Sequence, residues 1–283
     1  LSKAAECLYT SQPNISKNIR SLERELGRPL LKRSGTGVQP TVYGKTVLEY
    51  ARLILKNAAA ISSMAVPEET NSLCISAYPS NMVARLLVDF YRQWGEDYHI
   101  EYQEGAVEEI TDHVHQGISE IGIVHVALKQ VPVFQHILSH KKLEFVPLDV
   151  KKICVYVGAN NPLYHRDSID FQDLPRLKFM RGVRDFFSME HHLETVSMGV
   201  IDTRNLYHAV YTNSDHLIID LLLHTDVCSL GLEFMHEPYA QYDIKPLAIH
   251  GCEPFLQIGY VRDPERAFSP QAQWVVEHFR DML

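Results

Sequence analysis

Apolar residues recur at helical spacing along residues 11–27. Four of them are separated by four, three and four positions: Ile15, Ile19, Leu22 and Leu26. This spacing places them on one face of an α-helix, which we expect to pack on a preceding helix. Ser11 stands where a helix N-cap lies, and Gly27 is a natural helix end. The pattern therefore predicts an amphipathic helix that ends near Gly27.

A shorter helix and a hairpin flank this segment. Ser2 can cap a helix over residues 3–8, and residues 9–10 leave room only for a tight turn. Residues 29–41 form two extended pieces around a glycine-bearing tip, which predicts a β-hairpin. This order is typical of a winged helix-turn-helix, although a helix pair in a small bundle is an alternative. The first residue is not Met and lies inside the first helix, so we expect this head to be N-terminally incomplete.

The face opposite the apolar stripe is polar and basic. Near its amino end it carries Gln12, Asn14, Ser16 and Lys17. Gln or Asn can bond adenine in two places, and Lys can address guanine or a phosphate. In the hairpin, Lys32 and Arg33 are expected to meet the DNA backbone or the minor groove.

A second apolar series, from about Tyr43 to Met64, has a period near 3.5. Its members are Val47, Leu48, Ala51, Ile54, Leu55, Ala58 and Ile61. This period suits a helix that pairs with another helix, although packing on its own chain is an alternative. A helix of roughly 20 residues spans about 30 Å. The pattern predicts a linker helix that holds the head away from the next domain.

Strand-like and helix-like segments alternate after residue 70. Strands are predicted at residues 73–77, 99–104, 121–126, 153–157, 178–180 and 227–230, and helices at residues 83–94, 110–117, 189–198 and 215–224. Alternation of this kind predicts an α/β domain of parallel strands and crossover helices. Such sheets bind ligands beyond the carboxyl ends of their strands.

Charge is distributed unevenly along the 283 residues. The chain has a net charge of -8, yet residues 1–66 hold ten Lys and Arg against four Glu. A basic head on an acidic body indicates that only the head meets a polyanion. No segment has the length and apolarity of a membrane span, and no secretory signal begins the chain, so we expect a cytoplasmic protein with no membrane partner.

Other chemistry has little support in the sequence. The five cysteines are scattered without a C-x-x-C spacing, and the fifteen histidines lack regular metal-ligand partners. No nucleophile elbow, Walker loop or H-E-x-x-H motif is present. We therefore expect no enzyme activity, no metal and no cofactor.

The head resembles the LysR family of bacterial transcriptional regulators. The resemblance rests on Ser2 to Ala5, Leu8, Ser11 to Pro13, Ser16, Ile19, Leu22, Glu23, Glu25 to Gly27, Leu30, Arg33, Thr41 and Gly44. Two positions depart from the family pattern. Asn14 stands where a small apolar residue is common, which bears on the base that is read, and Leu31 stands where Phe is usual.

The resemblance implies roles for the residues of the head. Base-reading and groove-facing places fall to Gln12, Pro13, Ser16 and Lys17, and backbone-contact places to Ser11, Arg20 and Arg33. With Asn14 and Lys32, these residues are the predicted DNA-binding set. The resemblance also favours antiparallel pairing of the linker helix with a second subunit, in a homodimer or homotetramer.

The rest of the chain resembles the family's effector domain, more loosely than the head does. This domain has the two-lobed α/β fold of periplasmic binding proteins. The implied organisation is a winged helix-turn-helix at residues 1–42, a linker helix at 43–66 and an effector domain at 71–283. We expect lobe I at about 71–151 and 262–283, and lobe II at about 152–261.

Residues that follow predicted strands are candidates for binding a small-molecule effector. They are Pro79, Ser80, Asn81, His125, Arg181 and Gly182. Free N–H groups at residues 79–81, together with Arg181, would favour an anionic ligand. A family departure at His224 to Asp226 and at Leu230 and Gly231 is expected to alter one wall of the cleft.

Two classes of function follow from these observations. The first is a regulator that binds double-stranded DNA in a sequence-specific manner and responds to a small molecule held between two α/β lobes. The second is a solute-binding protein or enzyme of the same two-lobed fold. The absence of an export signal and the basic head favour the first.

Overall fold

The computed structural model describes residues 4–5, 10–34, 37–64, 71–95, 98–182, 185–233, 239 and 241–283. The chain divides into two compact units, Leu1–Glu69 and Thr70–Leu283.

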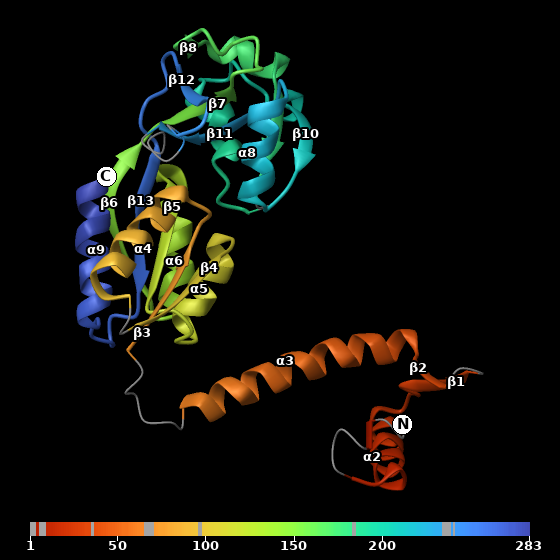
Figure 1. Ribbon diagram of the computed structural model, residues 1–283. Helices are drawn as coiled ribbons and strands as arrows, with labels where there is room; N and C mark the ends of the chain where they lie inside the picture. Colours follow the sequence, from red (N-terminus) through yellow and green to blue (C-terminus); the bar gives the residue numbers. More distant parts are fainter. Residues whose placement is uncertain are drawn as a thin grey trace. The chain divides into compact units, whose positions relative to one another are not determined.

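The longer described elements of the first unit are two helices and the two strands of a hairpin. They are α2 (Gln12–Leu26), β1 (Leu31–Ser34), β2 (Gly37–Pro40) and α3 (Val42–Met64), with β1 antiparallel to β2 (Figure 1). Of the predicted first helix only Ala4 and Ala5 are described, and both are helical; the hairpin tip at residues 35–36 also lies outside the described residues. Gly27 ends α2 in the left-handed conformation, as a helix C-terminus prefers.

Ser11 differs from its expected role in capping. It occupies the N-cap position of α2 with extended backbone, but its side chain makes no cap hydrogen bond. Its carbonyl oxygen instead accepts hydrogen bonds from the N–H groups of Asn14 and Ile15. The hydroxyl of Ser11 is therefore not needed to hold the helix.

Three residues of the head pattern hold the hairpin between the two helices. The carboxylate of Glu23 accepts hydrogen bonds from the N–H groups of Leu30, at 2.7 Å, and Leu31, at 3.0 Å. The hydroxyl of Thr41 donates to the carbonyl of Pro29 and accepts from the N–H of Gly44. A Cβ on Gly44 would lie 2.0 Å from the carbonyl oxygen of Leu30, so only glycine allows this approach.

The second unit has two sheets, which form its two lobes (Figure 1). Lobe I has a five-stranded sheet in the order β4-β3-β5-β13-β6. The strands are β3 (Ser72–Ala77), β4 (His99–Glu104), β5 (Ile121–Ala127), β6 (Glu144–Lys151) and β13 (Leu256–Arg262), and the helices are α4 (Asn81–Trp94), α5 (Val107–His115), α6 (Val131–His140) and α9 (Pro270–Met282).

Lobe II has a six-stranded sheet in the order β10-β9-β11-β7-β12-β8. The strands are β7 (Ile153–Gly158), β8 (Ser168–Ile169), β9 (Lys178–Arg181), β10 (Tyr207–Tyr211), β11 (Cys228–Leu232) and β12 (Ile244–Ile249). Its longest described helix is α8 (Asp215–His224). The remaining elements are α7 (Leu193–Val196) and short 3-10 helices at Phe171–Arg176, Met189–His192 and Thr203–Asn205, with a further 3-10 turn at Leu128–Gln130 in lobe I.

The observed topology corrects three expectations. The sheets are mixed, because β13 runs antiparallel to β5 and β6, and β7 runs antiparallel to β11 and β12. Residues 256–262 belong to the sheet of lobe I, so lobe II ends before residue 261. The helix expected at residues 189–198 is two short helices, Met189–His192 and Leu193–Val196.

The chain passes between the lobes at two places that lie side by side. It leaves lobe I between β6 and β7, and it returns between β12 and β13. The N–H of Phe255 donates to the carbonyl of Lys151 at 3.0 Å, which joins the two passages. The link between the lobes is thus a pair of hydrogen-bonded chain segments.

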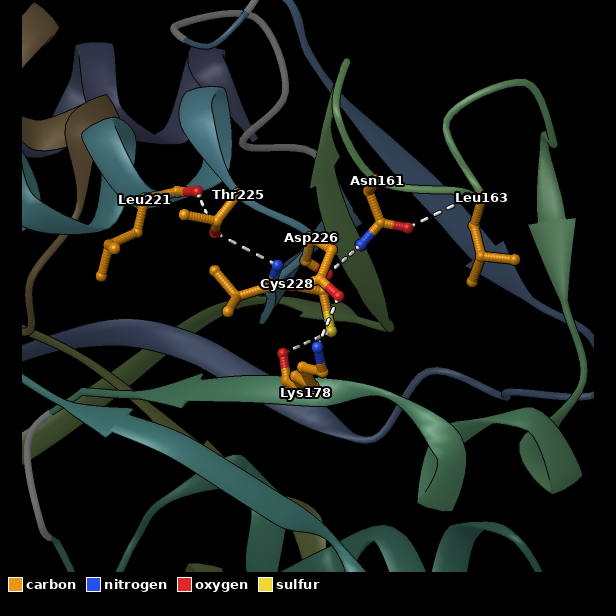
Figure 2. Close-up of polar contacts among 8 residues, drawn as sticks. Asn161, Leu163, Lys178, Leu221, Thr225, Asp226 and Cys228 are labelled. Atoms are coloured by element: carbon orange, nitrogen blue, oxygen red, sulfur yellow. Dashed lines mark hydrogen bonds and ion pairs between the residues drawn. The ribbon is translucent and has the colours of Figure 1, made fainter.

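Thr225 and Asp226, which lie where the sequence departs from the family pattern, form polar contacts that hold the end of α8 against the sheet of lobe II (Figure 2). The hydroxyl of Thr225 donates to the carbonyl of Leu221, and the buried Asn161 side chain donates to the carbonyl of Asp226 at 2.6 Å. The carboxylate of Asp226 pairs with the ammonium of Lys178 on β9 at 2.6 Å. These polar contacts fix the turn from α8 to β11.

Gly158 at the end of β7 offers a test of the packing of α8 on its sheet. A Cβ at this position would lie 1.8 Å from the carbonyl oxygen of Leu222, a backbone atom that cannot turn aside. Gly158→Ala is expected to lower the free energy of unfolding by about 1–3 kcal/mol, measured by urea denaturation. Gly182→Ala, which meets nothing within 4 Å, is the control and should leave stability nearly unchanged. Equal stability of the two variants would contradict this packing.

Candidate functional site

The outer face of α2 is polar and open. Gln12, Asn14, Lys17 and Arg20 are exposed, and Ser16 is half-buried. Gln12 donates from Nε2 to Ser16 Oγ at 3.3 Å, and Asn14 donates from Nδ2 to Thr10 Oγ1 at 3.0 Å. These weak, exposed contacts leave the side chains able to turn toward another partner.

The other predicted DNA-binding residues flank this face. Ser11 and Pro13 are exposed at the amino end of α2, and Lys32 is exposed on β1. The side chain of Arg33 lies outside the described residues. The structure therefore places eight of the nine predicted side chains on α2, at its start or on the hairpin, and all eight have accessible surface.

The linker helix α3 has an uncovered apolar face within the described part of the first unit. Ile54 is 66% exposed and Leu55 is 69% exposed, and Leu48 on the same helix is also exposed. Isolated apolar residues on a surface are ordinary, but a helical series of them is typical of an interface. The face has the length and composition of a helix-pairing surface.

A cavity lies between the two lobes of the second unit. Lobe I contributes residues 78–80, Met82 and residues 123–125, and lobe II contributes residues from the ends of several strands and from residues 188–190 and 212–215. Of the six predicted effector residues, Pro79, Ser80, His125 and Gly182 line this cavity. The side chain of Asn81 lies outside the described residues.

Ser80 acts as the N-cap of α4. Its Oγ accepts a hydrogen bond from the N–H of Met82 at 3.3 Å, and its carbonyl oxygen accepts from the N–H of Val83 at 3.2 Å. These bonds satisfy two of the N–H groups that would otherwise face a ligand. The amino end of α4 is thus a weaker anion site than the sequence indicated.

Arg181 is engaged within lobe II and is not among the residues that line the cavity. Its Nε lies 2.8 Å from a carboxylate oxygen of Glu190, and its Nη2 lies 3.1 Å from His191 Nε2. Desolvation raises the pKa of Glu190, and the nearby guanidinium opposes that rise. Because Arg181 compensates this buried carboxylate, it has little charge to offer an anionic ligand.

His125, which lies inside β5 and not after it as expected, is a neutral polar group in the wall of the cavity. It is 6% exposed, and its ring meets the ring of Tyr78 edge-on at 4.4 Å. Burial lowers the pKa of His125 to about 4, so the imidazole is uncharged at neutral pH. Its Nε2 has no hydrogen-bond partner among the described residues, and this leaves one buried polar atom available to a ligand.

Sequence reasoning missed Asp215 and Glu190, which also line the cavity. Asp215 follows Ser214, whose Oγ accepts from the N–H of Leu217 at the start of α8. This helix start in lobe II corresponds to Ser80 and α4 in lobe I. The Ser-Asp pair at the start of the predicted helix 215–224 could have identified it, but the strand before that helix, β10 (Tyr207–Tyr211), was not predicted.

A bridging segment, residues 185–187, extends from lobe II onto lobe I. The carboxylate of Asp185 accepts hydrogen bonds from the N–H of Val107 at the start of α5, at 2.7 Å, and from the N–H of Phe187, at 2.9 Å. The ring of Phe187 is buried beside Phe134 in a cluster whose other members belong to lobe I, with ring centroids 5.3 Å apart. The carbonyl of Phe186 accepts from Gln130 Nε2 at 2.9 Å.

The described residues contain little that indicates other chemistry. Among them, no group of three or more His, Cys, Asp or Glu side chains is placed to hold a metal ion. The four cysteines described, Cys74, Cys154, Cys228 and Cys252, are free thiols, and burial raises the pKa of Cys74 to about 11. None of the described helices combines the length and apolarity needed to cross a bilayer.

Comparison with known proteins gives consistent relationships. Residues 1–45 match the bacterial regulatory helix-turn-helix proteins of the lysR family, and residues 68–283 match the LysR substrate binding domain. The Hca operon transcriptional activator HcaR of Escherichia coli (strain K12) is 27% identical over 183 residues, which are 63% of this chain and 58% of HcaR. The regulator BenM of Acinetobacter baylyi is 26% identical over 216 residues, 70% of this chain and 67% of BenM.

A solved structure covers the whole fold. Full-length CbnR complexed with its target DNA has a TM-score of 0.62 and 19% identity, and the alignment covers 100% of this chain and 94% of CbnR. At this identity the likeness concerns the fold. The helix-turn-helix head and the two-lobed domain together define a DNA-binding regulatory protein with an effector-binding domain.

The chain belongs to the LysR family, because the family's two domain types match nearly its whole length. The expected combination of winged helix-turn-helix, linker helix and two-lobed α/β domain is confirmed. The individual DNA-binding and effector-binding residues stay predictions.

Phe187 provides a test of the bridging segment. The Phe187→Ala variant lacks the buried ring that packs in the cluster of lobe I. Its free energy of unfolding, measured by denaturant titration, should be about 3–5 kcal/mol lower than that of the wild type. Phe186→Ala is a matched control, because the neighbouring ring is largely exposed and its backbone contact survives the substitution. A Phe187→Ala variant as stable as Phe186→Ala would show that the segment does not hold the lobes.

His125 predicts a specific dependence of stability on pH. The folded-state pKa of about 4 lies below the ordinary value of 6.5, so the unfolded chain binds this proton first as pH falls. The stability from neutral His125 is present above pH 6.5 and is lost toward pH 4, by at most about 3 kcal/mol. His125→Asn should reduce this loss in unfolding measured across pH 7 to 4.5, whereas substituting the exposed His216 should not. Identical pH profiles for the wild type and His125→Asn would contradict the assignment.

Proposed function

We propose that this chain is a sequence-specific DNA-binding transcriptional regulator whose two-lobed unit senses a small molecule. The observation that carries the proposal is the exposed polar and basic face of α2, next to a hairpin that also carries a basic residue. This arrangement suits a recognition helix in a major groove and a wing on the backbone. HcaR, a transcriptional activator, and CbnR, seen with its target DNA, support it as relatives.

Within the head, different residues take different roles. Gln12, Asn14, Ser16 and Lys17, near the amino end of α2, would read base edges, with Pro13 facing the groove. Ser11, Arg20, Lys32 and Arg33 would contact phosphates and so position the helix without reading sequence. The side-chain amide of Asn14 would form hydrogen bonds with a base edge, which the small apolar residue common at this position cannot do.

The partner of the linker helix would be a second copy of the chain. The exposed apolar residues of α3 would be buried by antiparallel pairing with the same helix of another subunit. A homodimer or homotetramer would place two or more heads on one DNA. Its subunits would bind half-sites at a spacing set by the assembly.

The cleft of the second unit would hold the effector. A ligand that binds the closed arrangement of the lobes more tightly than the open one shifts the population toward the closed arrangement. This difference in affinity is sufficient for the ligand to act as an effector. The bridging segment adjoins residues 188–190 of the cavity, so a ligand there would act directly on the connection between the lobes. Closure would alter the arrangement of subunits and thereby the spacing of the heads.

The DNA-binding proposal can be tested by selecting duplexes from a randomised pool with the purified chain. Gln12→Ala and Lys17→Ala should each relax base preference at one or two positions, at about 1–3 kcal/mol for each bidentate base contact that the substitution removes. Lys32→Ala and Arg33→Ala should weaken all selected sequences alike and reduce the salt slope by about 0.9 for each phosphate that is no longer neutralised.

Arg176→Ala is the control, since this exposed arginine belongs to the second unit. It should change neither sequence preference nor salt slope. Selection of no consensus by the wild type, or an unchanged consensus in both the Gln12 and Lys17 variants, would contradict the recognition helix.

A further inference from the structure

Carboxylates from both lobes face the cleft. Glu104 ends β4 in lobe I, and Asp215 begins α8 in lobe II. Asp215 lines the main cavity, and Glu104 lines an adjoining hollow that shares Pro79, Thr212 and Asn213 with it. Burial and the negative charge of Glu104 raise the pKa of Asp215 to about 6, which indicates that the two groups repel each other across the cleft.

The described residues that line the cavity and the adjoining hollow include no Lys or Arg opposite these carboxylates. Arg181 is turned to Glu190, and the first N–H groups of α4 and α8 are capped by Ser80 and Ser214. An anion entering the cleft would therefore meet carboxylates and no Lys or Arg side chain among the described lining residues.

A second observation points to a ligand at the same place. The buried Nε2 of His125 has no partner among the described residues, and the His125 side chain lines the cavity. A neutral imidazole can accept a hydrogen bond from a ligand N–H or O–H group. A buried polar atom without a partner is costly, so a ligand that satisfies it gains binding energy.

Much of the remaining wall is apolar and aromatic, although Ser188, Thr212, Asn213 and Ser229 also line it. Its apolar and aromatic members include Met82, Ile123, Met180, Ile218 and Tyr239. Tyr156 also lines it, but its hydroxyl already donates to the carbonyl of Leu232 at 2.8 Å. No described group of three or more metal-ligating side chains is present, which favours an organic cation over a metal ion. The wall suits an apolar body that carries one charged end.

We propose that the effector is a small organic amine, with its ammonium group at Glu104 and Asp215, an apolar body along the cavity, and a hydroxyl or N–H group that donates to His125 Nε2. The inference rests on the effector role of the cleft proposed above. A cation between the two carboxylates removes their repulsion, so it stabilises the closed arrangement of the lobes. The ligand thereby acts as a counter-charge that none of the described lining residues supplies.

The test compares ligands that differ only in the charge of one end. Phenylethylamine and tyramine are each set against the alcohol and the carboxylate with the same body, phenylethanol and phenylpropanoate, and 4-hydroxyphenylethanol and 4-hydroxyphenylpropanoate. The phenol of tyramine can donate to His125 Nε2, whereas phenylethylamine lacks that donor. Binding to the full chain is measured at neutral pH by calorimetry and by the shift of the thermal unfolding midpoint. At least one amine should bind and stabilise the chain, at least tenfold more tightly than its alcohol, and the carboxylates should not bind.

Variants locate the binding. Glu104→Gln and Asp215→Asn should each weaken the amine at least tenfold while the alcohol is unaffected. Asp220→Asn is the matched control, because this exposed carboxylate lies on α8 outside the cavity, and it should bind the amine like the wild type. The substitutions at Glu104 and Asp215 are at partly exposed positions, so circular dichroism should show folded variants.

Each remaining outcome overturns the proposal. Binding of the carboxylates in preference to the amines, binding of neither amine, or amine binding that survives both substitutions would show that the ligand class is wrong. These results would leave the role of the head intact, because DNA selection is measured without a ligand. Failure of DNA selection would instead contradict the proposed function while leaving the ligand measurements interpretable.

Discussion

The paired passage of the chain between its two lobes is the constraint on which the second unit depends. The β6 to β7 and β12 to β13 segments are joined by a backbone hydrogen bond, so a movement of the lobes that bends one passage also acts on the other. The bridging segment adds a third connection, in which a carboxylate caps α5 and an aromatic ring enters the core of lobe I. The cleft lies among these connections, so its width reflects the state of all three.

Charge compensation decides which polar groups remain for a ligand. Arg181 and Glu190 satisfy each other, and Asp185 is used by backbone N–H groups. The carboxylate of Glu104 accepts a hydrogen bond from the hydroxyl of Tyr102, and Asp215 stays without a cation among the described lining residues. For the same reason, a positive residue near a cleft is poor evidence for an anionic ligand. A partly buried guanidinium forms an ion pair with the nearest buried carboxylate, as Arg181 does with Glu190.

The described part of the head could be predicted from sequence almost residue by residue, because apolar spacing and the glycine at the end of α2 act locally, although the side chain of Ser11 makes no cap hydrogen bond. The order of strands in the second unit could not, since β13 pairs with β5 and β6 across more than a hundred residues and its antiparallel direction leaves no local sign. Four of the six effector candidates line the cavity because strand ends were located correctly. The ion pair of Arg181 with Glu190 and the position of Asp215 in the cleft depend on tertiary contacts, which the spacing of residues along the sequence does not reveal.

The contacts of Glu23, Thr41 and Gly44 make α2, the hairpin and the start of α3 a single stiff piece. A helix of the 23 residues of α3 is about 35 Å long at ~1.5 Å per residue. If α3 rotates by about ten degrees about the end farther from the head, the end that carries the head moves by roughly 6 Å. This displacement is larger than the ~3.4 Å step between neighbouring base pairs. A modest rotation is therefore enough to take the reading side chains out of register with their bases, without any rearrangement inside the head.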